Sequence, residues 1–190
     1  MPIVLHLGRS VKEYIECGEE IVKQLIKDGL ICCETCTEPM GRHSSYERGI
    51  KETGERIEIT VARCGRCERG HALLPDFILP NKHYSGNEIE SVIIDSGEMP
   101  VSHIETKASE STVKRWIRQI GERVERAVSM TKALFSQMGR AISEIAIDAG
   151  TGYAELEQVL EMAPEQVKHS GNKLGLANLW LGRINRRSYI

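Results

Sequence analysis

Two pairs of cysteines with the same internal spacing are the residues of this chain best suited to chemistry. Cys33 and Cys36 form one Cys-x2-Cys motif, Cys64 and Cys67 form a second, and twenty-seven residues separate the pairs. Two thiolates at this spacing can occupy two corners of a tetrahedron around zinc, and a second pair completes the shell. Such a site has no open position for water, so we expect a structural and not a hydrolytic Zn2+.

Two further cysteines and one histidine near the motifs are additional candidate ligands. We expect Cys17 to be a small buried residue of an N-terminal helix. Cys32 adjoins the first motif, but Cys32-x3-Cys36 is a less typical spacing and we treat Cys32 as spare. His71 follows the second motif by four residues and is either a substitute ligand or, as we favour, a packing residue. A redox role for the motifs is disfavoured because neither starts a helix in a βαβ pattern.

The segment between the motifs must bring them together, and its pattern predicts a hairpin. Residues 56–63 alternate polar and apolar, which places Ile57, Ile59 and Val61 on one side of a strand. Gly54 provides a turn after a first strand at about 43–50. Residues 70–80 are apolar but contain two prolines, so we expect a docking strap across the neighbouring domain in preference to a helix.

Helical patterns occupy most of the remaining chain. Residues 10–28 predict an amphipathic helix, and helices are expected at about 85–94 and 100–106 and from Ser109 onward. Apolar or small residues recur at alternating steps of three and four over 117–145, the seam of a long packed helix or of a coiled coil that could form a homodimer.

These elements predict a mostly α fold with a small β zinc ribbon, followed by a helix-turn-helix and a long C-terminal helical region. The expected divisions are an N-terminal helix at 1–30, the ribbon at 31–80, the helix-turn-helix at 81–120 and the helical remainder at 121–190.

The composition argues against bulk attraction to nucleic acid and against a membrane protein. The net charge is −2, so any basic surface must be local. No secretory leader or bilayer-spanning apolar stretch is visible, and cysteines paired for a metal suit a reducing compartment. We therefore expect a cytoplasmic protein.

The helix expected from Ser109 has the polarity of a DNA-reading helix. An apolar stripe of Val113, Trp116, Ile117 and Ile120 can clamp it to the preceding helices. The opposite face presents side chains able to contact phosphates or base edges. These candidate DNA contacts are Ser109, Ser111, Thr112, Lys114, Arg115 and Arg118.

Other basic residues are weaker candidates. The ribbon contains seven: Arg42, Arg48, Lys51, Arg56, Arg63, Arg66 and Arg69. Nearby glutamates offset most of these, which predicts a mixed and solvated face. Arg183, Arg186 and Arg187 near the C-terminus could also clasp DNA, although a solvated terminus is the simpler interpretation.

Several motifs together resemble a known type of protein. They are Cys33-x2-Cys36, His43, Tyr46-Glu-Arg48, Arg63-Cys-x2-Cys67, His71-Ala-Leu-Leu-Pro-Asp-Phe-x-x-Pro80 and Tyr84-Ser85. Over about 30–120 the chain resembles an uncharacterised bacterial zinc-ribbon family associated with mobile elements, and it is similar to the N-terminal zinc ribbon and helix-turn-helix of insertion-sequence transposases. One departure is that Thr37 and Glu68 replace the glycine usual after the second cysteine of each motif.

The resemblance implies DNA binding in transposition or its regulation, and it implies no catalysis. Transposase nucleases need acidic residues on an RNase-H-like α/β core. No segment after residue 120 has the sequence pattern of the strands of such a core. Asp76, Asp95 and Asp148 form no recognisable constellation. We therefore expect a non-enzymatic DNA-binding protein, transposon-associated or a transcription regulator. The alternative is an adaptor that binds a transposase or polymerase subunit.

Overall fold

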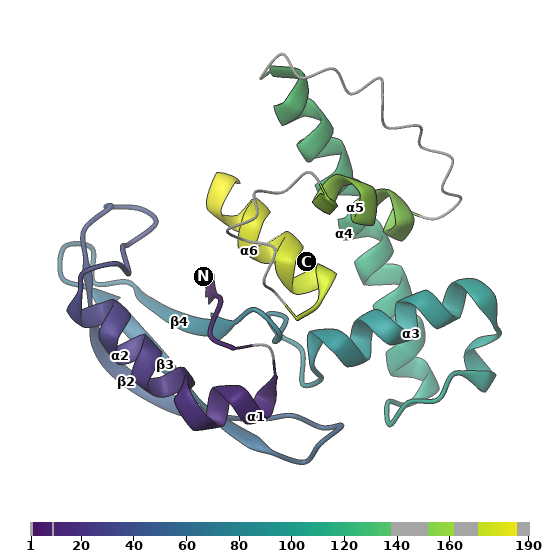
Figure 1. Cartoon of the computed structure of the whole chain (residues 1–190), viewed down its shortest axis with the longest axis horizontal. Coiled ribbons are helices and arrows are strands. Elements are labelled where there is room, and N and C mark those ends of the chain that lie inside the picture. Colours follow the sequence, from purple (N-terminus) through teal and green to yellow (C-terminus); the bar gives the residue numbers. More distant parts are fainter. Residues whose placement is uncertain (1, 9, 138–151, 162–170, 186–190) are drawn as a thin grey trace.

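The computed structural model describes residues 2–8, 10–137, 152–161 and 171–185. Within them lie one small sheet and a larger number of helices, which agrees with the mostly α fold class expected from the sequence. The sheet and the N-terminal helix form one side of the molecule, and the later helices form the other (Figure 1).

The N-terminal segment forms a short strand and then a helix. Strand β1 (Ile3–Leu5) precedes α1 (Val11–Glu13), a π-helical segment η1 (Tyr14–Gly18) and α2 (Glu19–Lys27), which follow one another without a break. The Ser10 side chain accepts a hydrogen bond from the Glu13 amide and caps the first turn. The helix expected at 10–28 is therefore confirmed.

The π-helical segment is where the packing of this helix differs from expectation. Tyr14 is buried, and its ring lies against Gly18, where an added Cβ would stand 2.2 Å from a ring carbon. Position 18 therefore requires glycine, because the Tyr14 ring leaves no room for a side chain. Cys17, expected to be buried, is instead exposed, and its thiol donates to the Glu13 carbonyl at 3.1 Å. The buried positions of this segment, Tyr14 and Gly18, are four apart, which turns Cys17 to solvent.

The sheet has four strands in the order β1-β4-β3-β2. Strands β2 (Met40–Gly49), β3 (Arg56–Cys64) and β4 (Gly70–Pro75) are antiparallel neighbours, and β1 pairs parallel with β4. The expected hairpin is confirmed.

The alternation along β3 is only partly as predicted. Ile57 and Ile59 are buried, but the burial pattern then changes phase, so that Thr60 is buried and Val61 is only half-buried. A β-bulge between Arg42 and Ser44 on β2 lies opposite this point of β3.

The apolar segment after β4 connects two hydrophobic cores. Phe77 and Ile78 belong to the core between the sheet and the N-terminal helix, whereas Leu79 and Tyr84 belong to the core of the later helices. The prediction of a docking strap at 70–80 is therefore only partly confirmed, because residues 70–75 form strand β4 within the sheet. The connection between the two cores is made by residues 76–84, which we call the strap.

The second core is built from α3 (Gly86–Glu98), α4 (Glu110–Gln137), α5 (Gly152–Glu161) and α6 (Lys173–Asn185). The helix expected at 100–106 is reduced to the single 3-10 turn η2 (Val101–His103), because Ile104 already adopts an extended backbone. None of the described helices has the length and hydropathy needed to cross a bilayer.

The first part of the seam predicted at 117–145 packs against other helices of the same chain. Ile120, Val124 and Ala127 of α4 are at most 1% exposed and lie in the core shared with α5 and α6. Residues 138–145 of the seam lie outside the described residues, as do Asp148, Arg186 and Arg187.

Candidate metal centre

The β2–β3 hairpin brings the two cysteine motifs to one place. Met40, at the start of β2, pairs with Cys64, at the end of β3. The first cysteine loop (residues 33–38) leads into β2, and the second cysteine loop (residues 64–69) leads from β3 into β4. As a result the four sulfurs, of Cys33, Cys36, Cys64 and Cys67, lie within 4.8 Å of one another.

Both cysteine loops have the same backbone hydrogen bonds. In the first, the carbonyl of Cys33 accepts from the amide four residues later at 2.8 Å, and its own amide donates to the carbonyl five residues later at 2.9 Å. In the second loop the equivalent bonds of Cys64 are both 3.0 Å. Each pair of thiols is thus presented by the same tight turn.

The residue after the second cysteine has a left-handed backbone in both loops. Thr37 and Glu68 each have a φ of 60°, a region that normally favours glycine. The replacement of the usual glycines therefore leaves the turn geometry intact, although a side chain there costs on the order of 1 kcal/mol.

Sulfur separation and burial both fit a closed metal site. Tetrahedral ligation with metal–sulfur bonds of about 2.3 Å places sulfurs about 3.8 Å apart, whereas a disulfide needs about 2.05 Å. The Cys33 and Cys67 sulfurs are 3.6 Å apart. Cys33 and Cys64 are buried, and Cys36 and Cys67 are half-buried. The four thiols could therefore hold one metal ion.

The thiols also differ in acidity. The backbone amides of Cys36 and Thr35 stabilise the Cys33 thiolate and lower its pKa to about 6. A hydrogen bond to Cys67 and burial raise the pKa of the Cys36 thiol to about 12. Within the first cysteine loop, Cys33 is therefore the thiol that more readily becomes a thiolate.

The other ligand-type residues lie outside this cluster. Cys17 and Cys32 are exposed, and His71 is buried on β4 opposite Ala62. Among the described residues, the four cysteines are the only group of three or more potential metal ligands found close together.

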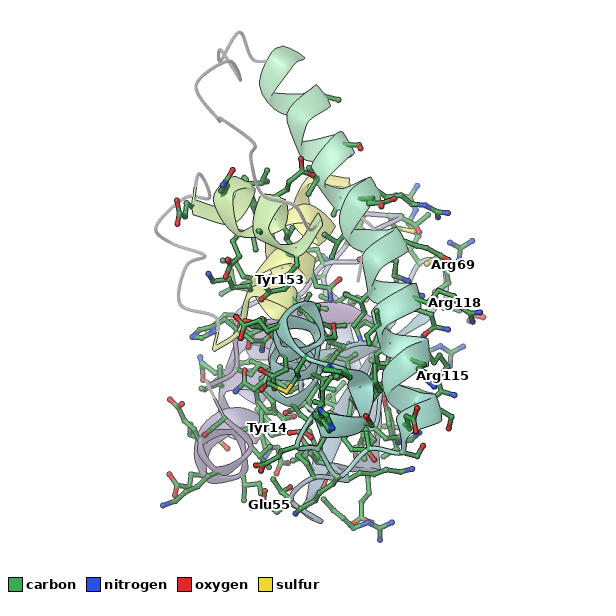
Figure 2. All side chains as sticks on the ribbon, turned by 90° about the vertical axis from the view of Figure 1, so that its right-hand side faces the viewer. Tyr14, Glu55, Arg69, Arg115, Arg118 and Tyr153 are labelled. Atoms are coloured by element: carbon green, nitrogen blue, oxygen red, sulfur yellow. The ribbon has the colours of Figure 1, made fainter. Side chains whose placement is uncertain are left out.

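The structure places the predicted DNA contacts around the first turns of α4. Five of them, Ser109, Ser111, Lys114, Arg115 and Arg118, are exposed, and Thr112 is half-buried. In Figure 2, Arg115 and Arg118 point outward from α4. Lys114 is paired with Glu110 at 2.6 Å.

The opposite side of α4 is firmly anchored. Val113, Trp116 and Ile120 are 1–2% exposed, as their spacing predicts. The Trp116 ring meets Tyr84 of the strap edge to face, with centroids 4.8 Å apart. The expected inward stripe is confirmed at these three positions.

Most basic side chains of the ribbon are neutralised locally, as expected from the neighbouring glutamates. Four arginines lie within 4 Å of a glutamate oxygen. The pairs are Arg42–Glu58, Arg56–Glu47, Arg63–Glu68 and Arg66–Glu38. Arg69 instead donates to Thr35 at 3.1 Å and so links the two cysteine loops.

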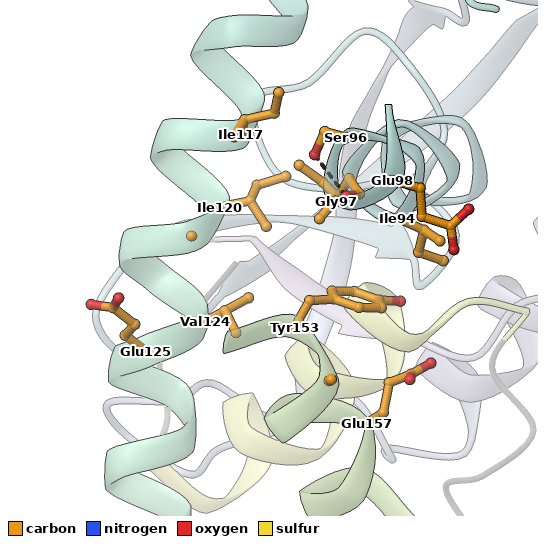
Figure 3. A pocket seen from close by; sticks show the side chains of 13 residues that line it. Ile94, Ser96, Gly97, Glu98, Ile117, Ile120, Val124, Glu125, Tyr153 and Glu157 are labelled. Atoms are coloured by element: carbon orange, nitrogen blue, oxygen red, sulfur yellow. Dashed lines mark hydrogen bonds between the residues drawn. The ribbon is translucent and has the colours of Figure 1, made fainter. Parts of the chain in front are cut away.

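Two hollows adjoin α4, and the sequence predicted neither. One, of about 550 Å³, lies between α3, α4 and α5 and is largely apolar, with Ile94, Val124 and Tyr153 in its wall (Figure 3). The other, of about 430 Å³, lies between α4 and the strap and is rich in cations. Both are built from segments far apart in the sequence, which explains why sequence patterns missed them.

Fold and site together define a tetracysteine β-hairpin module joined by a strap to a helical core. Residues 33–116 match a protein family described as a domain of unknown function, DUF6431. The match begins at the first candidate ligand and ends at Trp116, so it spans the hairpin, the strap, α3 and the first turns of α4. No curated protein and no solved structure is significantly similar to the chain.

Proposed function

We propose that the chain is a non-enzymatic, sequence-specific DNA-binding protein in which zinc stabilises the hairpin module and α4 enters the groove of a duplex. Zinc is the proposed ion because four thiolates in a tetrahedral arrangement suit it, and because a closed shell serves structure. The residues that would hold it are Cys33, Cys36, Cys64 and Cys67.

The observation that carries the proposal is the division of α4 into an anchored face and an exposed basic face. Val113, Trp116 and Ile120 hold the helix in the core. Arg115 and Arg118 are exposed and form no ion pair within the part of the chain that the structure describes. A rigid helix with free guanidinium groups near its N-terminus suits both phosphate oxygens and guanine edges.

A helix-turn-helix also requires a supporting helix and a connecting turn. Helix α3 packs on α4 and would serve as the supporting helix. Eleven residues, 99–109, join them and contain the turn η2. This connection is longer than the three or four residues usual in the motif.

The test is a fluorescence-anisotropy titration with duplexes selected from a random library. Arg115→Ala and Arg118→Ala should each weaken binding by about tenfold, since each removes a contact worth about 1–3 kcal/mol. Lys114→Ala should have a smaller effect because Lys114 is already paired with Glu110. Lys27→Ala, on the exposed side of α2, is the control for loss of one positive charge.

Two results would contradict the proposal. Absence of any selected sequence and of any salt-sensitive affinity would remove DNA as the partner, and co-purification with a transposase or polymerase subunit would then favour the adaptor. Unchanged affinity of both arginine variants would show that α4 is not the reading element. A role in transposition or in transcription regulation would follow from the sequence of the selected site.

A further inference from the structure

The cation-rich hollow beside α4 is formed where three separate segments meet. Lys51 comes from the β2–β3 turn, residues 80–84 come from the strap, and Arg115 and Arg123 come from α4. Of the residues that the structure describes, four lysines and arginines and His83 line it, and no aspartate or glutamate does. In a chain of net charge −2, this is a local concentration of positive charge.

The wall of the hollow is held in place by hydrogen bonds. Lys82 donates from Nζ to Oε1 of Gln119 on α4 at 2.8 Å. Behind it, the half-buried guanidinium of Arg48 donates to the carbonyls of Leu79 and Lys82. The Lys51 ammonium stands 5.9 Å from the centre of the Tyr84 ring, in cation–π range. Lys82 is thus tied to α4, and Lys51 is held near the Tyr84 ring.

Within the described residues, no carboxylate forms an ion pair with the lysines and arginines of this hollow. Burial lowers the pKa of Lys82, and the nearby Arg123 and Arg115 lower it further, so the cations repel one another. Four ribbon arginines, Arg42, Arg56, Arg63 and Arg66, are by contrast each paired with a glutamate. An anion entering the hollow would relieve this repulsion.

We propose that this hollow binds a phosphate group of the DNA backbone and so fixes the register of α4 on the duplex. The inference rests on the proposed function and adds residues to it, namely Lys51, Lys82 and Arg123. Arg115 belongs both to the hollow and to the exposed face of α4, so a strand lying along that face passes the mouth of the hollow. Phosphate contacts of this kind position a protein while base contacts specify the sequence.

The experiment is the salt dependence of duplex binding by the full chain. The double variant Lys51→Gln/Arg123→Gln avoids Lys82, whose hydrogen bond to α4 supports the fold. Its matched control is Lys12→Gln/Lys27→Gln, which removes the same charge from exposed positions of the N-terminal helix. Each lost phosphate contact should lower the slope of log K against log salt by about 0.9 and the affinity by about tenfold at 0.1 M salt.

The outcomes separate this inference from the proposed function. If the wild type binds no duplex, the proposed function fails first. The inference is overturned if the wild type binds and both double variants keep the wild-type slope of log K against log salt. It is also overturned if both variants lose that slope equally, because the hollow then holds no phosphate. An equal loss of affinity for a polyglutamate peptide would also overturn it, since the hollow would then respond to charge alone. A loss of slope in Lys51→Gln/Arg123→Gln only, with the base preference retained, supports it.

Discussion

At the scale of single residues, the four candidate ligands differ from the other two cysteines in where the fold places their thiols. Cys33, Cys36, Cys64 and Cys67 share one cluster, whereas Cys17 and Cys32 are exposed elsewhere. The difference arises because tight turns aim the paired thiols at one point.

Replacement of one ligand should remove the metal, and replacement of an outlying cysteine should not. We expect Cys64→Ser to lose bound zinc and to lower the free energy of unfolding by more than about 3 kcal/mol, because the ion's binding energy contributes to folding. Cys17→Ser should keep one zinc per chain and change stability by no more than about 0.5 kcal/mol. Elemental analysis and urea unfolding measure both quantities. Full metal content in Cys64→Ser would contradict the proposed site.

Tyr14 should make stability depend on alkaline pH. Burial, with Glu19 and Glu58 nearby, raises its pKa from 10.0 to about 12, and its hydroxyl donates to the Glu58 carbonyl at 2.7 Å. Above pH 10 the unfolded chain loses this proton while the folded chain keeps it, so stability falls as pH rises from about 10 to 12. The loss is at most about 1.4 kcal/mol per pH unit.

The comparison for this effect is Tyr14→Phe. The variant should be less stable by about 1 kcal/mol at pH 8, because the hydrogen bond is lost. Between pH 10 and 12 its stability should fall less steeply than that of the wild type. Parallel curves, measured by urea unfolding at each pH, would show that Tyr14 does not ionise differently in the fold.

At the scale of elements, α4 has one face anchored in the second core and one face exposed. Its glycine at position 121 is a weak point of helix propensity. Helix α6 contains another glycine, Gly175, whose surroundings are entirely different. An added Cβ would stand 2.1 Å from the Asp76 backbone oxygen at Gly175, but would meet nothing within 4 Å at Gly121.

The same substitution should therefore have opposite effects at the two sites. Gly175→Ala should destabilise the fold by about 1–3 kcal/mol, since a backbone oxygen cannot move aside and α6 must shift away from the strap. Gly121→Ala should stabilise it by about 0.5–1 kcal/mol, because alanine loses less backbone entropy in a helix. Thermal unfolding of both variants measures the difference. A stable Gly175→Ala protein would contradict the close packing of α6.

At the scale of the whole molecule, two hydrophobic cores are joined by one strap. The first lies between the sheet and the N-terminal helix, and the second lies among α3, α4, α5 and α6. Figure 1 shows the two groups of elements side by side, with β4 leading from one to the other. The four cysteines that could hold a metal lie wholly in the first.

Removal of the metal should therefore affect the two parts unequally. With a chelator present, amide hydrogens in the two cysteine loops and at the adjoining ends of β2 and β3 should lose protection, because their turns depend on the ion. Amides of α3 and of the first turns of α4 should keep theirs. Hydrogen exchange followed by mass spectrometry resolves these segments. Equal loss of protection throughout would mean that the cores unfold as one unit.

The sequence alone determined the parts whose signal is local. The four candidate ligands, the hairpin between them, the Ser10 cap and the inward stripe of α4 all follow from spacing and periodicity within short segments. Local hydrogen bonding and side-chain period act over a few residues, so a linear pattern is enough to show them.

Tertiary structure decided everything that depends on segments far apart in the chain. It placed Lys51, Lys82 and Arg123 around one hollow and left Cys17 exposed to solvent. It also packed Ile120 and Val124 of the predicted seam against other helices of the same chain. The physical reason is that charge clustering and burial depend on distances set by the packing of whole elements, which no short stretch of sequence contains.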